Sequence, residues 1–196
     1  MQNKITPILL AAGLILLSCK ADKAEHIETL SEEQLALLRE GDFVLRLGYG
    51  LVSYTLEMQG GSVGVSHIGV LVKDSADFEV IHSISGSMAE LDGVQKISLE
   101  DFLQEARPNS LIAVRFKNSN EKLITNEARR LLAARVPFDL SFDLKDTTKL
   151  FCSEFIDFIL RKTHNTTVFS PEEDGFPFSV FLDTSKFEIL VDNRIR

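Results

Sequence analysis

The chain has 196 residues, of which 44% are hydrophobic, and this length and composition fit one globular domain with a sizeable core. Its formal net charge is −8. Phosphate binding depends on clustered Lys and Arg, and the sequence has no such cluster, so these numbers argue against a nucleic-acid partner.

The first twenty residues, MQNKITPILLAAGLILLSCK, have the pattern of a secretory signal: a cation at Lys4, an apolar run over 5–17, then small residues. Leu16-Leu17-Ser18-Cys19 resembles the bacterial lipobox, which implies cleavage before Cys19 and lipid on its thiol. The alternative is an ordinary signal peptide with an incidental cysteine. We expect a lipoprotein signal peptide over 1–18, a lipid-anchored tether over 19–30 and a single globular domain over 31–196.

The first half of that domain is predicted to form two helices and three strands. Ser31 and Gln34 have capping-box spacing, which predicts a helix over 31–40, and residues 43–45 lead into a strand. A short helix and a Gly-rich loop are expected within 48–65. Two β-branched runs, 66–73 and 78–84, flank a turn-forming segment and predict an antiparallel hairpin.

The second half predicts alternating strands and helices. A strand over 93–97 precedes a helix capped by Ser98, and a strand over 110–116 precedes a helix over 118–134. A helix over about 151–162 and a last strand over 187–191 complete the α+β domain, an antiparallel sheet packed against helices. The helix over 118–134 is expected to face inward through Leu123, Ala128, Leu131 and Leu132.

Cys152 is the candidate nucleophile. If Cys19 carries lipid, Cys152 has no intramolecular disulfide partner in an exported protein. Its position in the first turn of a helix, with possible caps at Asp146, Thr147 and Thr148, is expected to lower the thiol pKa through the helix dipole. The alternative is a small buried hydrophobe, since free cysteines are among the most buried residues.

Two of the four histidines are candidates to act with this thiol. His26 and His164 are expected to be solvated. In the predicted hairpin, position 67 opposes 84 and position 68 opposes 83, so His67 and His82 become near neighbours on one face. We interpret His67 as the base of Cys152 and His82 as the residue that orients His67. Each histidine could instead be structural.

At these residues the sequence resembles the NlpC-type papain-like amidases and peptidases of bacterial cell walls, in the circularly permuted order of the YiiX/YebB-like branch. The resemblance spans about residues 39–162. Its motifs are Gly41-Asp42-Phe43, Ser66-His67-Ile68-Gly69, Val80-Ile81-His82 and Phe151-Cys152-Ser153-Glu154-Phe155, and Pro137-Phe138-Asp139 also fits.

The resemblance implies a permuted papain-like fold and a hydrolase that cleaves an amide through a thioacyl-enzyme, without a cofactor or metal. The substrate would be a peptidoglycan stem peptide or a related small amide. The partners would be this substrate and the membrane, reached through Cys19, and the protein would be exported to the cell envelope. Lys20 after the lipid cysteine favours the outer membrane. Ser66, Ser153 and Glu154 are candidates to line the substrate cleft.

The chain also departs from this family. Relatives often carry Glu where this chain has His82, and many carry a Tyr where it has Phe138. Oxyanion stabilisation would then depend mainly on the Cys152 backbone N–H and a neighbouring donor. The permuted lecithin:retinol acyltransferase-like enzymes also use a His-His-Cys set, but their Asn-Cys-Glu-His signature is absent here. Two other functions stay open: a non-catalytic envelope binding module that keeps the cleft, and a Cys/His/His zinc site.

Overall fold

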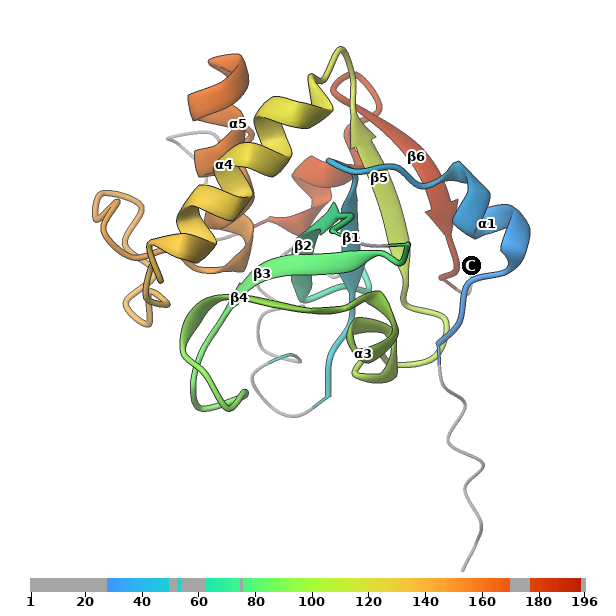
Figure 1. Cartoon of the computed structure of the whole chain (residues 1–196), viewed down its shortest axis with the longest axis horizontal. Coiled ribbons are helices and arrows are strands. Elements are labelled where there is room, and N and C mark those ends of the chain that lie inside the picture. The colour runs from blue at the N-terminus through green and yellow to red at the C-terminus, as the bar shows by residue number, and fades with distance from the viewer. Residues whose placement is uncertain (1–27, 50–52, 54–62, 75, 170–176, 195–196) are drawn as a thin grey trace, which may run out of the picture.

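The computed structural model describes residues 28–49, 53, 63–74, 76–169 and 177–194, which form an α+β structure around one six-stranded sheet (Figure 1). All strand pairs in the sheet are antiparallel, in the order β4-β3-β2-β1-β5-β6. Its elements are α1 (Glu32–Leu37), β1 (Phe43–Arg46), β2 (His67–Val72), β3 (Glu79–Ile84), β4 (Gly93–Ser98), α3 (Leu99–Gln104), β5 (Ile112–Phe116), α4 (Glu121–Ala133), α5 (Cys152–His164), the 3-10 helix η1 (Phe178–Leu182) and β6 (Phe187–Asp192).

Several sequence-based expectations lie outside the described residues. They include the signal peptide and Cys19, His26, and most of the helix and loop expected within 48–65. No helix in the described parts of the chain combines the length and apolarity that crossing a membrane requires. Glu28, at the end of the expected tether, is buried, and its carboxylate accepts hydrogen bonds from the Asn109 backbone N–H and the Asn193 side-chain amide.

The hairpin of β2 and β3 has the predicted register. Gly69 pairs with His82 and Val70 with Ile81, an alignment that places position 67 opposite 84. His67 and Gly69 therefore lie on the same face of the sheet as His82. The local signals at other elements are confirmed as well, since Ser31 and Gln34 form a capping box on α1 and Ser98 caps α3.

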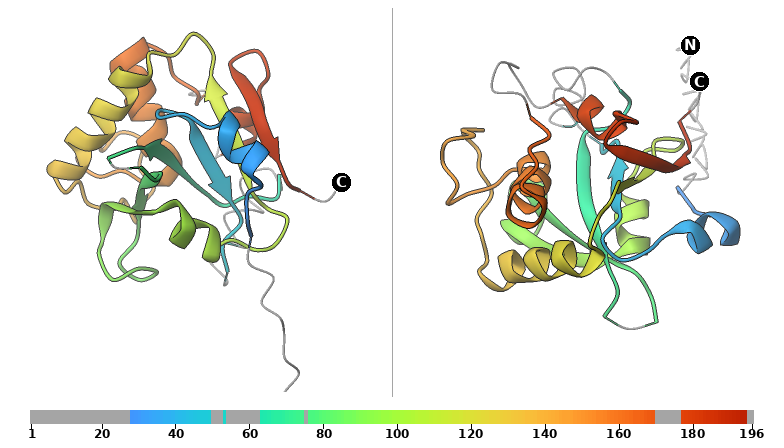
Figure 2. Two further views of the ribbon diagram at one scale, coloured as in Figure 1. Left: turned by 45° about the vertical axis from the view of Figure 1, so that its right-hand side comes forward. Right: turned by 90° about the horizontal axis from the view of Figure 1, so that it is seen from above.

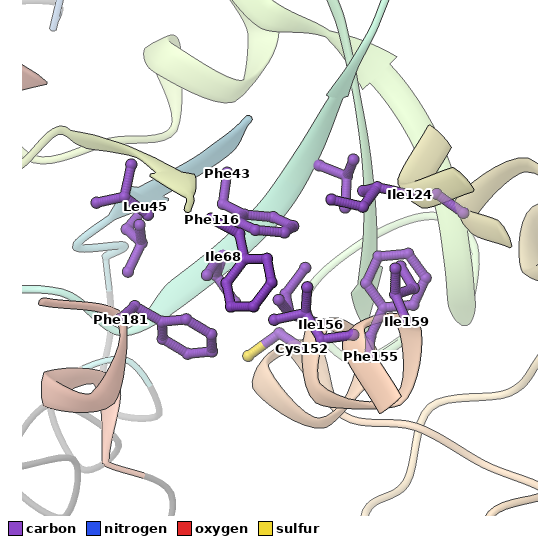
Figure 3. Close-up of a cluster of buried hydrophobic side chains, with 14 of the residues drawn as sticks. Phe43, Leu45, Ile68, Phe116, Ile124, Cys152, Phe155, Ile156, Ile159 and Phe181 are labelled. Carbon is purple, nitrogen blue, oxygen red and sulfur yellow. The ribbon is translucent and has the colours of Figure 1, made fainter. Parts of the chain in front are cut away.

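Helices α4 and α5 cover one face of the sheet and contact each other (Figures 1 and 2). The core on this side joins strand residues such as Phe43 and Ile68 to Phe155, Ile156 and Ile159 of α5 (Figure 3). The inward face of α4 differs in part from the expectation. Ala128 and Leu131 are buried as expected, Ile124 and Thr125 join them, and Leu123 is 45% exposed.

A second core lies on the opposite face of the sheet, where α3 packs against β3 and β4. Alternate strand residues such as Val44, Leu71 and Val80 meet Leu99, Phe102 and Leu103 of α3 there. Because Val80 and His82 share a face, the two strand histidines belong to this second layer. Cys152, at the start of α5, belongs to the first.

Candidate active site

The two strand histidines are in direct contact. His67 Nε2 lies 2.7 Å from His82 Nδ1, and the two rings meet edge to face with their centroids 5.0 Å apart. Gly69, the strand partner of His82, makes room for this contact. A Cβ at position 69 would lie 3.1 Å from the His82 Cβ and would collide with the Val80 side chain. The absence of a side chain at Gly69 therefore allows the rings of His67 and His82 to contact each other.

Phe102 and Arg46 enclose the histidine pair. The Phe102 ring stacks on His67 at 5.9 Å and meets the edge of His82 at 6.0 Å, while the Arg46 guanidinium lies 4.8 Å from the centre of the same ring. Arg46 is 4% exposed, donates to the backbone oxygen and carboxylate of Glu105, and its Nε is buried with no partner among the described residues. Sequence reasoning missed this buried cation, because the sequence does not show that the end of β1 lies beneath α3.

Cys152 is the first residue of α5, as expected, but the expected caps were wrong. The N-cap is Phe151, whose backbone N–H donates to the Glu154 carboxylate, whereas Asp146 accepts from Thr148 within its own turn. The Ser83 hydroxyl on β3 donates to the Leu150 carbonyl oxygen at 2.6 Å. This bond ties the start of α5 to the strand that carries His82.

A cavity of about 600 Å³ brings His67 and Cys152 to one site. Both residues line it, and the backbone N–H of Ile68, next to His67 in the chain, favours the charged form of the Cys152 thiol. In Figure 3 the sulfur lies at the tip of α5 and points away from Ile156 and Ile159. The first layer of the protein thus supplies the thiol and the second supplies the imidazoles.

Burial sets the protonation of these groups. It raises the pKa of Cys152 to about 12, against the smaller opposing effects of the N–H groups of Ser153, Ile68 and Cys152 and of the Arg46 charge. Burial, helped by Arg46, also lowers the pKa of His67 well below its usual value and that of His82 to about 3. The expectation of a lowered thiol pKa was therefore wrong: desolvation outweighs the helix dipole. At neutral pH the site holds a neutral thiol and two neutral imidazoles.

The candidate cleft residues divide into one that lines the cavity and two that do not. Ser66 lines it, and its hydroxyl accepts the Gly48 backbone N–H. Ser153 and Glu154 are buried away from it, so the expectation that they line the cleft was wrong. Burial raises the pKa of Glu154 to about 8. Both side chains lie at the start of α5, where every residue from Cys152 to Asp157 is buried.

The structure also shows where Phe138 and His164 lie. Phe138, where the family resemblance leads us to expect Tyr, lines the cavity. His164 is not simply solvated: its Nε2 accepts the Asn120 backbone N–H at 2.9 Å and its ring packs on the edge of Phe116. It therefore helps to hold the start of α4 against the end of α5.

The Cys/His/His set does not have the geometry of a zinc site. Zinc binds imidazole nitrogen at about 2.0–2.1 Å, so two nitrogens on one tetrahedral ion would lie about 3.3 Å apart. His67 Nε2 and His82 Nδ1 are closer, at 2.7 Å, and point at each other. Within the described residues, no group of three or more His, Cys, Asp or Glu side chains is arranged to hold a metal ion.

No protein-family model and no curated protein matches the sequence. Among solved structures, the chain is similar to the crystal structure of the metalloprotein YiiX from Escherichia coli O157:H7. The TM-score is 0.66 and the identity 15%, over 80% of this chain and 98% of that one. At this identity the similarity concerns the fold, and the chain has a YiiX-like α+β fold.

Proposed function

We propose that the protein is a lipid-anchored cysteine hydrolase that cleaves an amide bond through a thioacyl-enzyme. The observation that carries this proposal is the arrangement around one cavity: Cys152 and His67 line it, and His82 holds the far nitrogen of His67. His67 Nε2 is occupied by His82, so Nδ1 is the nitrogen that can serve the thiol. A nucleophile, a base and an orienting group in this order are what nucleophilic catalysis requires.

The proposed reaction starts from a neutral thiol. As the sulfur attacks the amide carbonyl, His67 Nδ1 takes the thiol proton, and it then gives that proton to the leaving amine. The thioester on Cys152 is hydrolysed by water, which releases the acid and restores the thiol. Arg46 acts on both charges of the first step: it opposes the imidazolium and stabilises the anion that forms on sulfur and oxygen.

The YiiX-like fold and the order of the four motifs support membership of the permuted NlpC-type papain-like family, with the hydrolase domain over 31–196. By that resemblance the substrate is a peptidoglycan stem peptide or a related small amide. We propose that Cys19 anchors the protein to the cell envelope by its lipid, with Lys20 favouring the outer membrane.

Acylation by p-nitrophenyl acetate tests the nucleophile without knowledge of the natural substrate. The thiol attacks the ester, p-nitrophenolate leaves, and an acetyl thioester remains on Cys152, where peptide mass spectrometry locates it. We expect His67→Ala to slow p-nitrophenolate release by about 10²-fold or more. His164→Ala, which alters a histidine on the far end of α5, is the matched control and keeps the wild-type rate. Acetylation elsewhere than Cys152, or equal rates for both variants, would overturn the proposal.

The raised pKa of Cys152 favours one alternative, an envelope binding module with an inert buried thiol. That alternative predicts no acetylation of Cys152 with or without the His67 substitution. A zinc enzyme predicts stoichiometric zinc in the purified protein and loss of activity with a chelator. The three functions therefore give different results in one set of measurements.

A further inference from the structure

One ring nitrogen of His82 is buried without a partner. Its Nδ1 lies 2.7 Å from His67 Nε2, whereas its Nε2 is buried and has no hydrogen-bond partner among the described residues. The side chain is only 2% exposed, so bulk water does not serve this nitrogen. Buried polar groups in folded proteins nearly always have a partner, and a group left without one costs free energy. A residue that serves His82 Nε2 is therefore expected nearby.

The proposed reaction determines which kind of partner this nitrogen needs. His67 Nδ1 can take the thiol proton only if the neutral ring carries its own proton on Nε2. That proton is donated to His82 Nδ1, so the proton of His82 lies on Nε2. In the other arrangement His82 Nδ1 donates to His67 Nε2, the proton of His67 lies on Nδ1, and the base is lost. A hydrogen-bond acceptor at His82 Nε2 selects the first arrangement, and a donor selects the second.

The register of the sheet places one polar side chain directly opposite His82. His82 pairs with Gln95 of β4, and residues paired in this way point to the same face of the sheet, with Cβ atoms about 4.5–5.5 Å apart. A glutamine side chain can span that separation. Apart from His67, the other strand residues around His82 on this face have no hydrogen-bonding side chain; they are Gly69, Leu71, Val80, Ile84, Gly93 and Ile97.

The amide of Gln95 is oriented to accept a hydrogen bond. Its Nε2 donates to the Leu91 carbonyl oxygen at 3.1 Å. A carbonyl oxygen only accepts, so the nitrogen of the amide must face Leu91 and the oxygen must face elsewhere. Within the described residues no group donates to this oxygen. The bond to His82 is not formed in the structure, but the last torsion of a glutamine side chain is loosely constrained, so the oxygen can turn toward His82.

We propose that Gln95 is a positioning residue of the site: its Oε1 accepts the proton of His82 Nε2 and so fixes the tautomers of both histidines. His67 then keeps a free Nδ1 for the Cys152 thiol. The inference rests on the proposed function and extends the chain of groups behind the nucleophile from His82 to β4. Gln95 does not line the cavity, so it acts through the two histidines.

Two variants separate this role from the bond to Leu91. Gln95→Leu removes both the donor to Leu91 and the acceptor for His82, whereas Gln95→Glu removes the donor and keeps an acceptor. Lys96→Met is the matched control. Lys96 is the next residue of β4, and its side chain lies on the other face of the sheet, where it forms surface ion pairs.

NMR reports the tautomers without any need for activity. The nitrogen-15 shifts of labelled imidazoles show which nitrogen of each ring carries the proton, and spectra of His67→Ala and His164→Ala assign the signals. At neutral pH we expect both site histidines to carry the proton on Nε2 in the wild type, in Gln95→Glu and in Lys96→Met. In Gln95→Leu the Nδ1 of His67 should become partly protonated. Wild-type tautomers in Gln95→Leu, or a wild type with the proton on His67 Nδ1, would overturn the inference.

Acylation by p-nitrophenyl acetate connects the tautomers to the reaction. Gln95→Leu should slow acylation of Cys152 by about tenfold, a part of the 10²–10⁴-fold contribution of a general base, and Gln95→Glu should restore most of the rate. Each variant is measured at a temperature at which it is folded. Equal losses in the Leu and Glu variants would show that Gln95 acts through its bond to Leu91, which overturns the inference.

The two measurements also separate this inference from the proposed function. Normal acylation of Cys152 with tautomers that do not depend on Gln95 would overturn the role of Gln95 and leave the hydrolase intact. Tautomers that depend on Gln95 in a protein whose Cys152 is never acylated would support the role of Gln95 in the histidine pair and overturn the enzyme.

Discussion

The charge balance around His67 differs from that of a His–carboxylate pair. A carboxylate at position 82 would stabilise the imidazolium, whereas this chain places a neutral imidazole there and a buried guanidinium beside it. The Arg46 charge opposes protonation of both histidines. His67 therefore stays unprotonated, and able to act as a base, down to low pH. The main free-energy cost of the reaction lies in forming the imidazolium and the anion of the transition state.

This balance predicts an unusual pH profile. Because the pKa of His67 is held well below 6.5, the rate of acylation by p-nitrophenyl acetate should not fall between pH 7 and pH 5. In Arg46→Met the opposing charge is gone, the pKa of His67 rises toward its usual value, and the rate should fall as the pH drops through that value. Arg130→Met, which removes an exposed arginine of α4, should keep the wild-type profile. A wild-type profile with an ordinary histidine step near pH 6.5 would contradict the assignment of Arg46.

His82 should matter through His67. In His82→Ala the Nε2 of His67 loses its partner, and the ring loses both its orientation and its tautomer. We expect slower acylation, by part of the typical 10²–10⁴-fold contribution of a general base, with a smaller loss in His82→Glu. In the Glu variant the new carboxylate should also raise the pKa of His67, which an NMR titration of the ring protons measures. Equal rates in wild type and His82→Ala would show that the contact is structural.

The proximity of His67 to His82 and to Cys152 could be predicted, and the protonation of these three residues could not. His67 and His82 follow from the hairpin register, which the turn residues and the alternation of side chains determine. The pKa of Cys152 depends on desolvation, which requires knowledge of what covers the helix start, and position in a helix does not supply it. The same missing information explains why Glu154 was expected in the cleft and is instead buried beside Cys152.

At the scale of elements, the β2–β3 hairpin depends on Gly69. Gly69→Ala would push a methyl group against Val80 and the His82 Cβ, which should move His82 away from His67. Overpacking of this kind costs about 1–3 kcal/mol in stability. We expect a lower melting temperature and acylation reduced at least as far as in His82→Ala, measured at a temperature where both variants are folded. Full activity at wild-type stability would show that the strand can shift without disturbing the pair.

Helix α5 should make stability depend on pH through Glu154. Its pKa rises from 4.5 in the unfolded chain to about 8 in the folded protein, so the folded state binds the extra proton between these values. The contribution of Glu154 to the free energy of unfolding is therefore fully present below pH 4.5 and is lost as the pH rises toward 8. Glu154→Gln keeps the shape without the charge, and we expect its melting temperature to fall less between pH 5 and pH 8 than that of the wild type. Glu33→Gln, at an exposed site on α1, should behave as the wild type does.

The presence and order of the described strands and α-helices could be predicted, but the orientation of a helix was harder to predict. In α4, Leu123 and Ile124 are adjacent and both apolar, so a stripe through either fits a helical period. The structure buries Ile124 and exposes Leu123, a rotation that the neighbouring α5 and β2 decide. The 3-10 helix η1 was not predicted at all, because five residues carry too little periodic signal.

At the scale of the whole molecule, the site needs both layers of the fold. His67 and His82 belong to the layer of Phe102, and Cys152 belongs to the layer of Ile68. The two layers meet at the start of β2, where the strand supplies an imidazole to one and a backbone N–H to the other. Arg46 reaches the same place from β1. Residues spread from 46 to 152 therefore act together only in the completed fold.

The proposed membrane anchor also concerns the whole molecule, because it limits how far the domain can lie from the membrane. The part of the chain that the structure describes begins at Glu28, which is hydrogen-bonded to Asn109 and Asn193. Nine residue steps separate Cys19 from Glu28, and a fully extended chain of that length spans at most about 30 Å. A lipid on Cys19 would therefore hold Glu28, and the domain to which it is bonded, within about 30 Å of the membrane surface.

Cys19→Ser tests this anchor in bacterial cells. Without the thiol no lipid can attach, so we expect the protein to move from the membrane fraction to the soluble fraction and to lose incorporation of labelled palmitate. Its melting temperature should equal that of the wild type, because the contacts of Glu28 and of the sheet remain. Lys20→Asp keeps the lipidated cysteine and should stay with membranes, while density separation should show it in the inner rather than the outer membrane. A Cys19→Ser protein that remains in the membrane fraction and still takes up palmitate would place the anchor elsewhere in the chain.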